Sequence, residues 1–275
     1  MIWSPLVLNY LTGGGQEPEV SEDNYEPNVP EEPITKLGDI WKLGEHRLIC
    51  GDSTDVNVIE RLLQEEKAQL LLTDPPYGID IVKQHKVGGG GELHFGKVRG
   101  NNWVDSKTYS PIIGDNTTDT AREAYHTALL YSENQIIFGG NYFTDFLPVS
   151  RCWIVWDKQN TGNFADAELA WTSFDQGVKL YHFMWNGLAR EGSRTVEGIT
   201  RVHPTQKPVG MLGEILKDFS KENDIILDGF GGSGSTLIAC EQLNRKCYMA
   251  ELDPHYCDVI IDRWEKFTGK KAELI

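Results

Sequence analysis

The sequence lacks the marks of membrane, disulfide-bonded and zinc-binding proteins. Among its 275 residues no run approaches the ~20 consecutive apolar residues of a membrane-spanning helix, and the first residues lack the basic stretch of a secretory signal. The five cysteines form no CxxC pair and no Cys/His cluster with zinc-ligand spacing. We therefore predict a cytoplasmic protein with buried thiols, no metal site and no membrane partner.

Basic residues are also scarce: 26 Lys and Arg stand against 41 Asp and Glu, for a net charge of −15. This balance argues against a nucleic-acid partner, because phosphate-binding proteins usually carry a basic footprint. The deficit is uneven, however. Residues 1–35 hold seven acidic residues, five of the twelve prolines and no Lys or Arg, which predicts a disordered tail or linker. Residues 36–275 then carry −8 and form the folded domain.

The folded domain alternates between buried strands and helices. Apolar runs predict strands at 46–50, 68–73, 135–138, 152–156, 224–227 and 246–251. Helical periodicity is found at 56–66, 121–132, 209–220, 235–243 and 255–267. Continuous apolar strands separated by helices favour a mostly parallel sheet with helices on both faces. The predicted fold class is therefore a doubly wound α/β fold.

Two stretches do not follow this alternation. Residues 83–107 contain four consecutive glycines and a net charge of +3, which predicts a flexible insert. Residues 186–202 carry three arginines among glycines. Long loops within a compact domain are usually functional or disordered.

A glycine-rich turn follows the strand at 224–227. It reads Asp228-Gly-Phe-Gly-Gly-Ser-Gly-Ser235 and leads into a helix. Glycines at such a turn let a ligand approach the backbone, and the helix start offers free amides. The next strand ends at Glu251, whose carboxylate suits ribose hydroxyls. Because the turn is not GxGxxG, a nucleoside without a pyrophosphate fits as well as NAD.

Two proline motifs add polar groups. Asp74-Pro75-Pro76-Tyr77 follows the strand at 68–73, and the prolines fix the backbone and remove amide donors. An acid, rigid carbonyls and an aromatic ring suit a planar ligand that bears an amino group, although a proline turn with a packed tyrosine explains the same residues. His203-Pro-Thr-Gln-Lys-Pro208 precedes the helix at 209–220, and a simple turn before a helix start is the alternative there.

Together, and in this order, DPPY, HPTQKP, the glycine turn and Glu251-Leu-Asp-Pro254 resemble the amino-group DNA methyltransferases. These enzymes use S-adenosylmethionine, and the motif order is similar to that of their permuted beta group, which includes adenine-N6 and cytosine-N4 enzymes. The resemblance covers about residues 36–268 and implies a Rossmann-like methyltransferase fold. Residues 36–275 are then expected to form the catalytic domain.

The resemblance also implies roles for individual residues. The catalytic site would comprise Asp74, Pro75, Pro76 and Tyr77. The cofactor would be held by Asp52, Thr205, Gln206, Lys207, Asp228, Phe230, Gly232, Gly234 and Glu251. This chain has Gly229 where the family usually has proline, which would loosen the turn, but it keeps every functional group that the chemistry needs.

The chemistry so implied is direct methyl transfer to a flipped-out base. Asp74 and the Pro75 carbonyl would accept hydrogen bonds from the exocyclic amine, with Tyr77 stacked on the ring. In the family DPPY is commoner among adenine-N6 enzymes, so adenine is favoured. The alternatives are a cytosine-N4 enzyme, an RNA methyltransferase and a non-catalytic DNA-binding module.

Recognition of DNA is assigned to the two irregular stretches. The family places its target-recognition region before HPTQKP, where only the short segment 179–202 is available, so we predict a short or relaxed recognition sequence. Phosphate or base contacts are expected from Lys83, Lys86, Lys97, Arg99, Arg190, Arg194 and Arg201. The resemblance further raises a restriction–modification role in a prokaryote or phage, a homodimer, and a restriction-enzyme partner or fused upstream domain.

Overall fold

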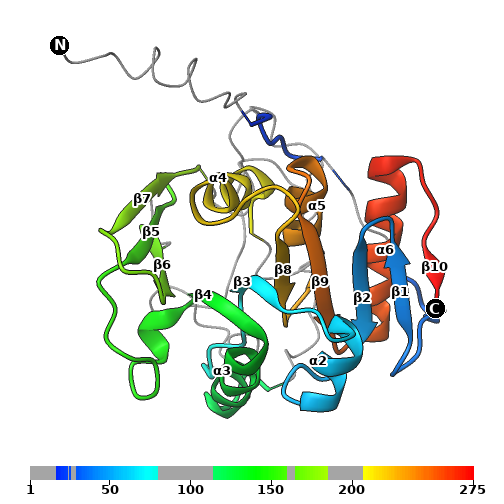
Figure 1. Ribbon diagram of the computed structural model, residues 1–275, viewed down its shortest axis with the longest axis horizontal. Helices are drawn as coiled ribbons and strands as arrows, with labels where there is room; N and C mark the ends of the chain where they lie inside the picture. The colour runs from blue at the N-terminus through cyan, green and yellow to red at the C-terminus, as the bar shows by residue number, and fades with distance from the viewer. Residues whose placement is uncertain (1–16, 24, 26–28, 80–113, 160–164, 185–206) are drawn as a thin grey trace, which may run out of the picture.

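The structure, a computed structural model, describes residues 17–23, 25, 29–79, 114–159, 165–184 and 207–275. Its centre is a ten-stranded mixed sheet in the order β10-β1-β2-β9-β8-β3-β4-β6-β5-β7 (Figure 1). The five middle strands run parallel: β2 (His46–Cys50), β9 (Lys246–Glu251), β8 (Ile225–Asp228), β3 (Ala68–Thr73) and β4 (Ser132–Phe138). Their ladder brings Leu70 opposite Ile226, both fully buried.

Shorter strands extend the sheet at both edges. On one side these are β1 (Ile40–Leu43) and β10 (Glu273–Leu274), each antiparallel to its inner neighbour. On the other side are β6 (Ala167–Thr172), β5 (Trp153–Asp157) and β7 (Lys179–His182), of which β6 is antiparallel to both β4 and β5. The sheet is therefore parallel in its middle and mixed toward its edges.

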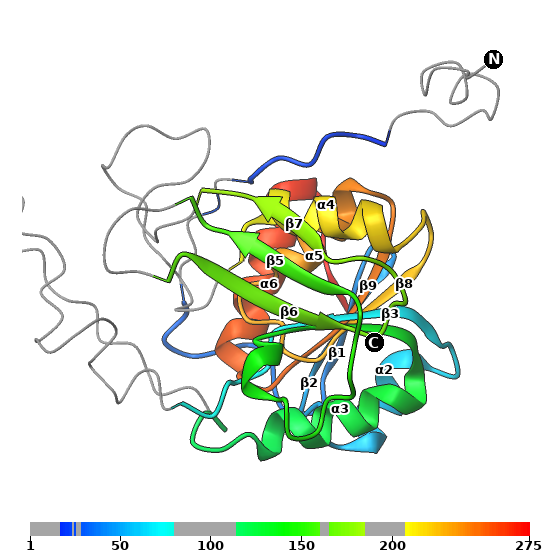
Figure 2. The ribbon, with the colours of Figure 1, turned by 90° about the vertical axis from the view of Figure 1, so that its left-hand side faces the viewer.

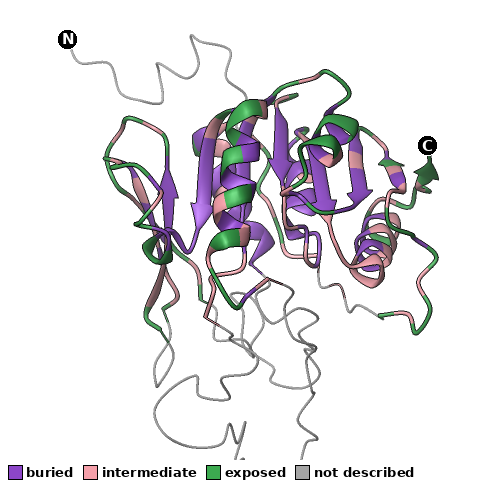
Figure 3. Cartoon of the chain, turned by 90° about the horizontal axis from the view of Figure 1, so that it is seen from below, coloured by how far each residue is buried: buried purple, intermediate pink, exposed green. Residues whose placement is uncertain are grey.

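Helices cover both faces of the sheet (Figure 2). One layer contains α4 (Val209–Phe219), α5 (Ser235–Gln242) and α6 (Pro254–Thr268), and the other contains α2 (Val56–Leu63) and α3 (Asp119–Tyr131). Side chains alternate between the two layers, so Leu70 and Leu72 join the first core and Leu71 joins the second. Two-sided burial explains the continuous apolar strands, and Figure 3 shows the middle strands buried with exposed positions on the outside of the helices and at the edges of the sheet.

The predicted fold class is confirmed: the sheet is mostly parallel and doubly wound. The sequence patterns missed β1, β6, β7 and β10, because these strands are short or mix polar with apolar residues. The insert 83–107 lies outside the described residues, and the segment 179–202 is described only to residue 184. None of the described helices is long and apolar enough to cross a membrane.

Part of the expected disordered tail lies against the folded body. Residues 17–23 and 25 contact α4, α5 and α6, and the backbone amide and hydroxyl of Thr35 donate hydrogen bonds to Asp258 on α6. These described residues thus make specific contacts with the folded body. Composition alone does not reveal that carboxylates of this segment form ion pairs with basic side chains of the folded body, such as Arg245 and Arg263.

The carboxyl ends of the parallel strands meet at one edge of the sheet, and the chain is tightly packed there. After β4 the backbone turns at Gly139, which has a positive φ of 69°. A Cβ atom at this position would lie 2.2 Å from the ring of Tyr77, which follows β3. Gly139 thus permits the approach of the Tyr77 ring to the end of β4.

We predict that Gly139→Ala destabilises the fold by about 2–4 kcal/mol, because it combines a steric overlap with a strained left-handed backbone. Gly177→Ala is the matched control, since a Cβ there meets nothing within 4 Å. Urea unfolding of both variants measures the difference. Equal stability of the two variants would contradict the close packing inferred at Gly139.

Candidate active site

Asp74 stands directly after β3, at the carboxyl edge of the sheet. Its Oδ1 accepts a hydrogen bond of 2.7 Å from the hydroxyl of Tyr77, and its Oδ2 is paired with the ammonium group of Lys207. The side chain of Asp74 is 17% exposed and that of Lys207 is 8% exposed. DPPY and the end of HPTQKP, 133 positions apart in the chain, therefore meet in one polar cluster.

Lys207 lies between two carboxylates. Besides Asp74, its Nζ is 3.4 Å from Oε2 of Glu168 on β6, and it lies over the ring of Phe138 with 5.0 Å between Nζ and the ring centroid. The other oxygen of Glu168 is paired with Lys158. Two cations and two carboxylates thus alternate in a chain from Lys158 to Asp74, which compensates the cost of burying each charge.

Burial and charge pairing oppose one another in this cluster. Burial raises the pKa of Asp74, and the neighbouring Lys207 ammonium counteracts only part of that rise. Burial alone would lower the pKa of Lys207, but Asp74 and Glu168 outweigh it and raise the pKa. Burial would raise the pKa of Glu168, yet Lys207 and Lys158 bring it below the usual value. Lys207 is therefore held as a cation and Glu168 as an anion.

Tyr77 is a hydrogen-bond donor in this cluster. Burial and the carboxylate of Asp74 raise the pKa of its phenol well above the usual value, so the phenol keeps its proton. Its ring stacks on Tyr142, with centroids 5.0 Å apart and planes inclined by 16°. Tyr142 is 44% exposed. A planar ligand that stacks in this place must therefore displace Tyr142 or lie against its outer face.

The glycine turn is fixed by buried polar contacts. Asp228, at the end of β8, accepts hydrogen bonds from the Thr73 hydroxyl (2.9 Å) and the Phe230 amide (3.1 Å). The hydroxyl of Thr73 in turn accepts a hydrogen bond from the Gly229 amide at 3.2 Å. Burial raises the pKa of Asp228 to about 6, against the effect of these hydrogen bonds. Thr73 therefore joins the end of β3 to the glycine turn.

Glu251 ends β9 beside the same turn. Its two oxygens accept hydrogen bonds from the amides of Gly232 (2.7 Å) and Asp253 (2.9 Å). Burial raises the pKa of Glu251 to about 7, and the two amides lower it in part. The carboxylate is thus already bound to the backbone of the turn that the ligand must approach.

One cleft of about 290 Å³ is lined by Asp74, Tyr77, Lys207, Asp228 and Glu251. The described site residues predicted from the sequence that line it are Asp52, Asp74, Pro75, Pro76, Tyr77, Lys207, Asp228, Phe230, Gly232 and Glu251. Asp52 is exposed, and its side chain is bound to the amide and hydroxyl of Thr54. Gly234 does not line the cleft. It turns the chain with a φ of 81° before α5.

The remaining predicted site residues lie outside the described residues. These are Thr205, Gln206, Lys83, Lys86, Lys97, Arg99, Arg190, Arg194 and Arg201. No group of three or more His, Cys, Asp or Glu in the described part of the chain has the arrangement of a metal site.

Sequence reasoning missed Glu168, Lys158 and Tyr142. Glu168 lies on β6, whose sequence AELAWT gave no clear strand signal, and its partner Lys207 is distant in the chain. Thr73 was also missed, although its position directly before Asp74 and its hydroxyl were visible signals.

The chain is similar to known DNA methyltransferases. Residues 157–262 match the family model N6_N4_Mtase, which is described as DNA methylase. The type II methyltransferase M2.LlaDCHI of Lactococcus lactis subsp. cremoris is 32% identical over 116 residues, which cover 41% of this chain and 41% of that protein. The type II methyltransferase M.BglII, from Bacillus subtilis, is 41% identical over 58 residues, or 21% of this chain and 16% of that protein.

The chain thus spans less than half of the length of these curated relatives. Among solved structures, the PvuII DNA methyltransferase (cytosine-N4-specific) has a TM-score of 0.51 and 14% identity, covering 88% of this chain and 94% of that one. That likeness supports the fold. The motifs of the sequence and the match of residues 157–262 agree in their similarity to N6/N4-type DNA methylases, and the sheet is similar to the Rossmann-like fold of the solved DNA methyltransferase.

Proposed function

We propose that this protein transfers a methyl group from S-adenosylmethionine to the exocyclic N6 of adenine in DNA. The observation that carries the proposal is the shared cleft: the carboxylate of Asp74 and the cofactor-type turn at Asp228–Ser235 open into the same space. One side of this cleft suits an amino group and the other a nucleoside. Residues 36–275 would form the catalytic domain, with 83–107 as its insert and 179–202 as its recognition segment.

The cleft has hydrogen-bond acceptors that suit the hydroxyl and amino groups of the cofactor. Glu251 offers carboxylate oxygens for ribose hydroxyls, and the backbone of Phe230 and Gly232 borders the space beside it. Asp228 and Asp52 line the same side. When bound, S-adenosylmethionine supplies an electrophilic methyl group on a sulfonium. The cost of burying these carboxylates is compensated only in part by the amides present, which favours a ligand rich in hydroxyl and amino donors.

The state of Asp74 suggests how the target amine is received. Its oxygens are occupied by Tyr77 and Lys207, so an entering exocyclic amine must compete for one of them. Glu168, 3.4 Å from the Lys207 ammonium, offers that cation a second partner. We propose that Lys207 moves toward Glu168 as the base enters. Asp74 then accepts a hydrogen bond from the amine, which localises the nitrogen lone pair for in-line attack on the methyl group, and it takes up the proton that the methylated nitrogen releases.

The choice of adenine rests on Asp74 as the first residue of the tetrapeptide. The alternative is cytosine N4, and it has its own support, because the PvuII enzyme with the similar fold is specific for cytosine N4. Both bases present an exocyclic amine to the same carboxylate. Digestion of methylated DNA to nucleosides distinguishes the two products, and N4-methylcytosine would overturn the adenine assignment.

Access to a base within a duplex requires that the base be flipped out. We propose that Tyr77 and Tyr142 together receive the flipped ring. The basic residues expected to contact DNA would hold the flanking phosphates. A restriction–modification role, with a restriction enzyme as partner or with a second copy in a homodimer, fits the type II relatives and belongs to the proposal.

We predict that Asp74→Ala lowers the rate of methyl transfer to unmethylated DNA by about a thousandfold, because the proton acceptor for the amine is lost. The variant should keep its fold, since Lys207 retains Glu168 as a partner. Transfer of tritiated methyl from S-adenosylmethionine measures the rate, and titration with S-adenosylhomocysteine should show nearly unchanged cofactor binding. Full activity in this variant would refute the assignment of Asp74.

We predict that Glu168→Gln lowers kcat about tenfold with little change in KM for the cofactor, because Lys207 then loses the partner that releases Asp74. Asp175→Asn is the matched control. Its partner Arg151 is exposed, and both side chains are 78% exposed, so its loss should have little effect. Steady-state kinetics on the same DNA compare the variants. Equal kcat values would exclude the proposed movement of Lys207.

We predict that binding of S-adenosylhomocysteine weakens about tenfold from pH 8 to pH 6. The pKa of Glu251 is about 7, so lowering the pH protonates the carboxylate that accepts the ribose hydroxyls. Affinity should rise through pH 7 and level off above it. Calorimetric titration of the wild type and of Glu251→Gln provides the test, and the variant should lose most of this pH dependence. A variant curve as steep as the wild-type curve would assign the titration to another group.

A further inference from the structure

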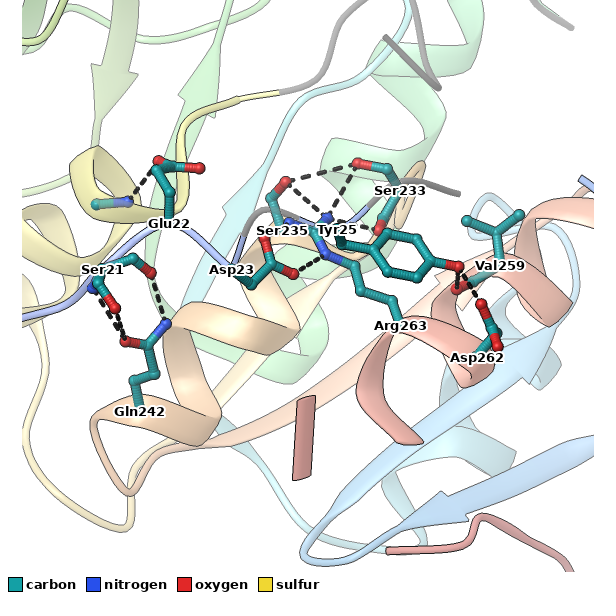
Figure 4. A network of polar contacts seen from close by, with 11 residues as sticks. Ser21, Glu22, Asp23, Tyr25, Ser233, Ser235, Gln242, Val259, Asp262 and Arg263 are labelled. Carbon is teal, nitrogen blue, oxygen red and sulfur yellow. Dashed lines mark hydrogen bonds and ion pairs between the residues drawn. The ribbon is translucent and has the colours of Figure 1, made fainter. Parts of the chain in front are cut away.

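An acidic segment of the chain lies across the helices behind the cleft. Residues 17–23 and 25, which we call the acidic arm, contact α4, α5 and α6 (Figure 4). On α5 the side-chain amide of Gln242 pairs with the backbone of Ser21, with distances of 3.0 Å to its nitrogen and 2.9 Å to its oxygen. Near its beginning, Glu17 pairs with the fully buried Arg245 at 2.9 Å. The arm therefore has specific contacts.

The arm also touches the first turns of α4, which follow directly on Lys207. Oε1 of Glu22 accepts a hydrogen bond of 3.0 Å from the amide of Gly210. Val20 lies over Gly213, where a Cβ atom would be only 2.6 Å from the Val20 side chain. A carboxylate near the start of a helix is favourably placed with respect to the helix dipole. This contact links the arm to α4, the helix that begins two residues after Lys207.

The central contact is the ion pair between Asp23 and Arg263 on α6. Two nitrogens of the guanidinium donate to the two oxygens of Asp23, at 2.6 and 2.9 Å, and the side chains are 3% and 1% exposed. The third nitrogen of Arg263 donates to the carbonyl oxygen of Ser233 at 2.8 Å and to the hydroxyl of Ser235 at 3.2 Å. Arg263 thus joins the arm to the glycine turn.

Tyr25 closes the arm over this pair. Its hydroxyl donates to Oδ2 of Asp262 at 2.5 Å, and its ring lies 5.7 Å from the Arg263 guanidinium. The ring of Tyr25 and the body of the arm keep water from the guanidinium. A buried arginine needs a charged partner, and removal of that partner is strongly unfavourable. The buried position of Arg263 beside the glycine turn therefore depends on its ion pair with Asp23.

We propose that Asp23 and Arg263 are positioning residues that hold the glycine turn in the conformation that binds the cofactor. Ser233 and Ser235 both line the cleft, and the turn contains glycines at 229, 231, 232 and 234, which restrict the backbone little. The guanidinium fixes this flexible turn from behind, and the arm fixes the guanidinium. The proposal rests on the proposed function in one respect, namely that the turn holds S-adenosylmethionine.

The test compares Asp23→Ala with Glu17→Ala. Both variants remove one buried ion pair of the arm, but Arg245, the partner of Glu17, bonds otherwise to Ser220 and Leu243 and not to the turn. Calorimetric titration with S-adenosylhomocysteine gives the affinity, and thermal unfolding without ligand gives the stability. We expect both variants to unfold at lower temperature, whereas Asp23→Ala alone should bind the ligand about tenfold more weakly.

Arg263→Lys provides a second variant. It keeps the charge but cannot reach Asp23 and Ser233 with separate nitrogens, so we expect weaker ligand binding in a folded protein, with KM for the cofactor raised more than kcat is lowered. Wild-type affinity in either folded variant, at Asp23 or at Arg263, would overturn the proposal. An equal loss of affinity in Glu17→Ala would also overturn it, because the arm would then act through stability alone.

Amide hydrogen exchange separates this proposal from the proposed function. In Asp23→Ala the amides of residues 230–235 should exchange at least tenfold faster than in the wild type, with no ligand present. If the wild-type protein did not bind S-adenosylhomocysteine, the proposed function would be wrong. The exchange experiment uses no ligand, so it would still test whether the arm holds the glycine turn. Unchanged exchange in the folded variant would reject the role of Asp23.

Discussion

The burial of carboxylates at one edge of the sheet is the constraint on which the rest of the site depends. A parallel sheet brings the ends of β3, β8 and β9 together, and each of these strands ends in or leads to an acidic residue. Water is largely excluded there, so every carboxylate needs a substitute for its solvation. The structure supplies a cation to Asp74, hydroxyl and amide donors to Asp228, and two backbone amides to Glu251.

The three acids differ in how their buried charge is compensated. Asp74 is paired with a cation that has a second partner within reach, so its compensation can be exchanged for an incoming donor. Asp228 and Glu251 are bound by the backbone of the turn itself, so their compensation is fixed when the chain folds. An exchangeable partner suits a group that takes part in a reaction. Fixed partners suit groups that shape a binding site.

Much of this site was predictable because its residues stand next to strong local signals. Asp74 and Glu251 follow clear apolar strands, and the turn from Asp228 is marked by its glycines. Parallel strand order then places them at one edge. Glu168 could not be found in this way, because β6 is half polar and its partner Lys207 is distant in the chain. Pairing between distant charges depends on tertiary packing, and neither periodicity nor spacing records it.

Predictions from amino-acid composition have the same limit, as the acidic arm shows. A stretch rich in Glu and Pro reads as disordered when its partners are unknown, yet Glu17 and Asp23 compensate two arginines that are almost fully buried. In the sequence, Arg263 stands within a predicted helix and Arg245 between a helix and a strand, and nothing at either position signals a carboxylate partner. The excess of acid in residues 1–35 is thus in part the counterpart of basic residues inside the body.

This pairing changes what the net charge of −15 says about nucleic acid. Arg245, Arg263 and Lys207 are buried and bound to carboxylates, so they neutralise the interior and cannot contact phosphate. Likewise, the carboxylates of Asp23 and Asp74 present no repulsive charge to a DNA backbone. The total charge therefore counts many groups that no DNA phosphate meets. What a phosphate meets is the local field of the exposed groups, and net charge alone does not exclude a DNA substrate.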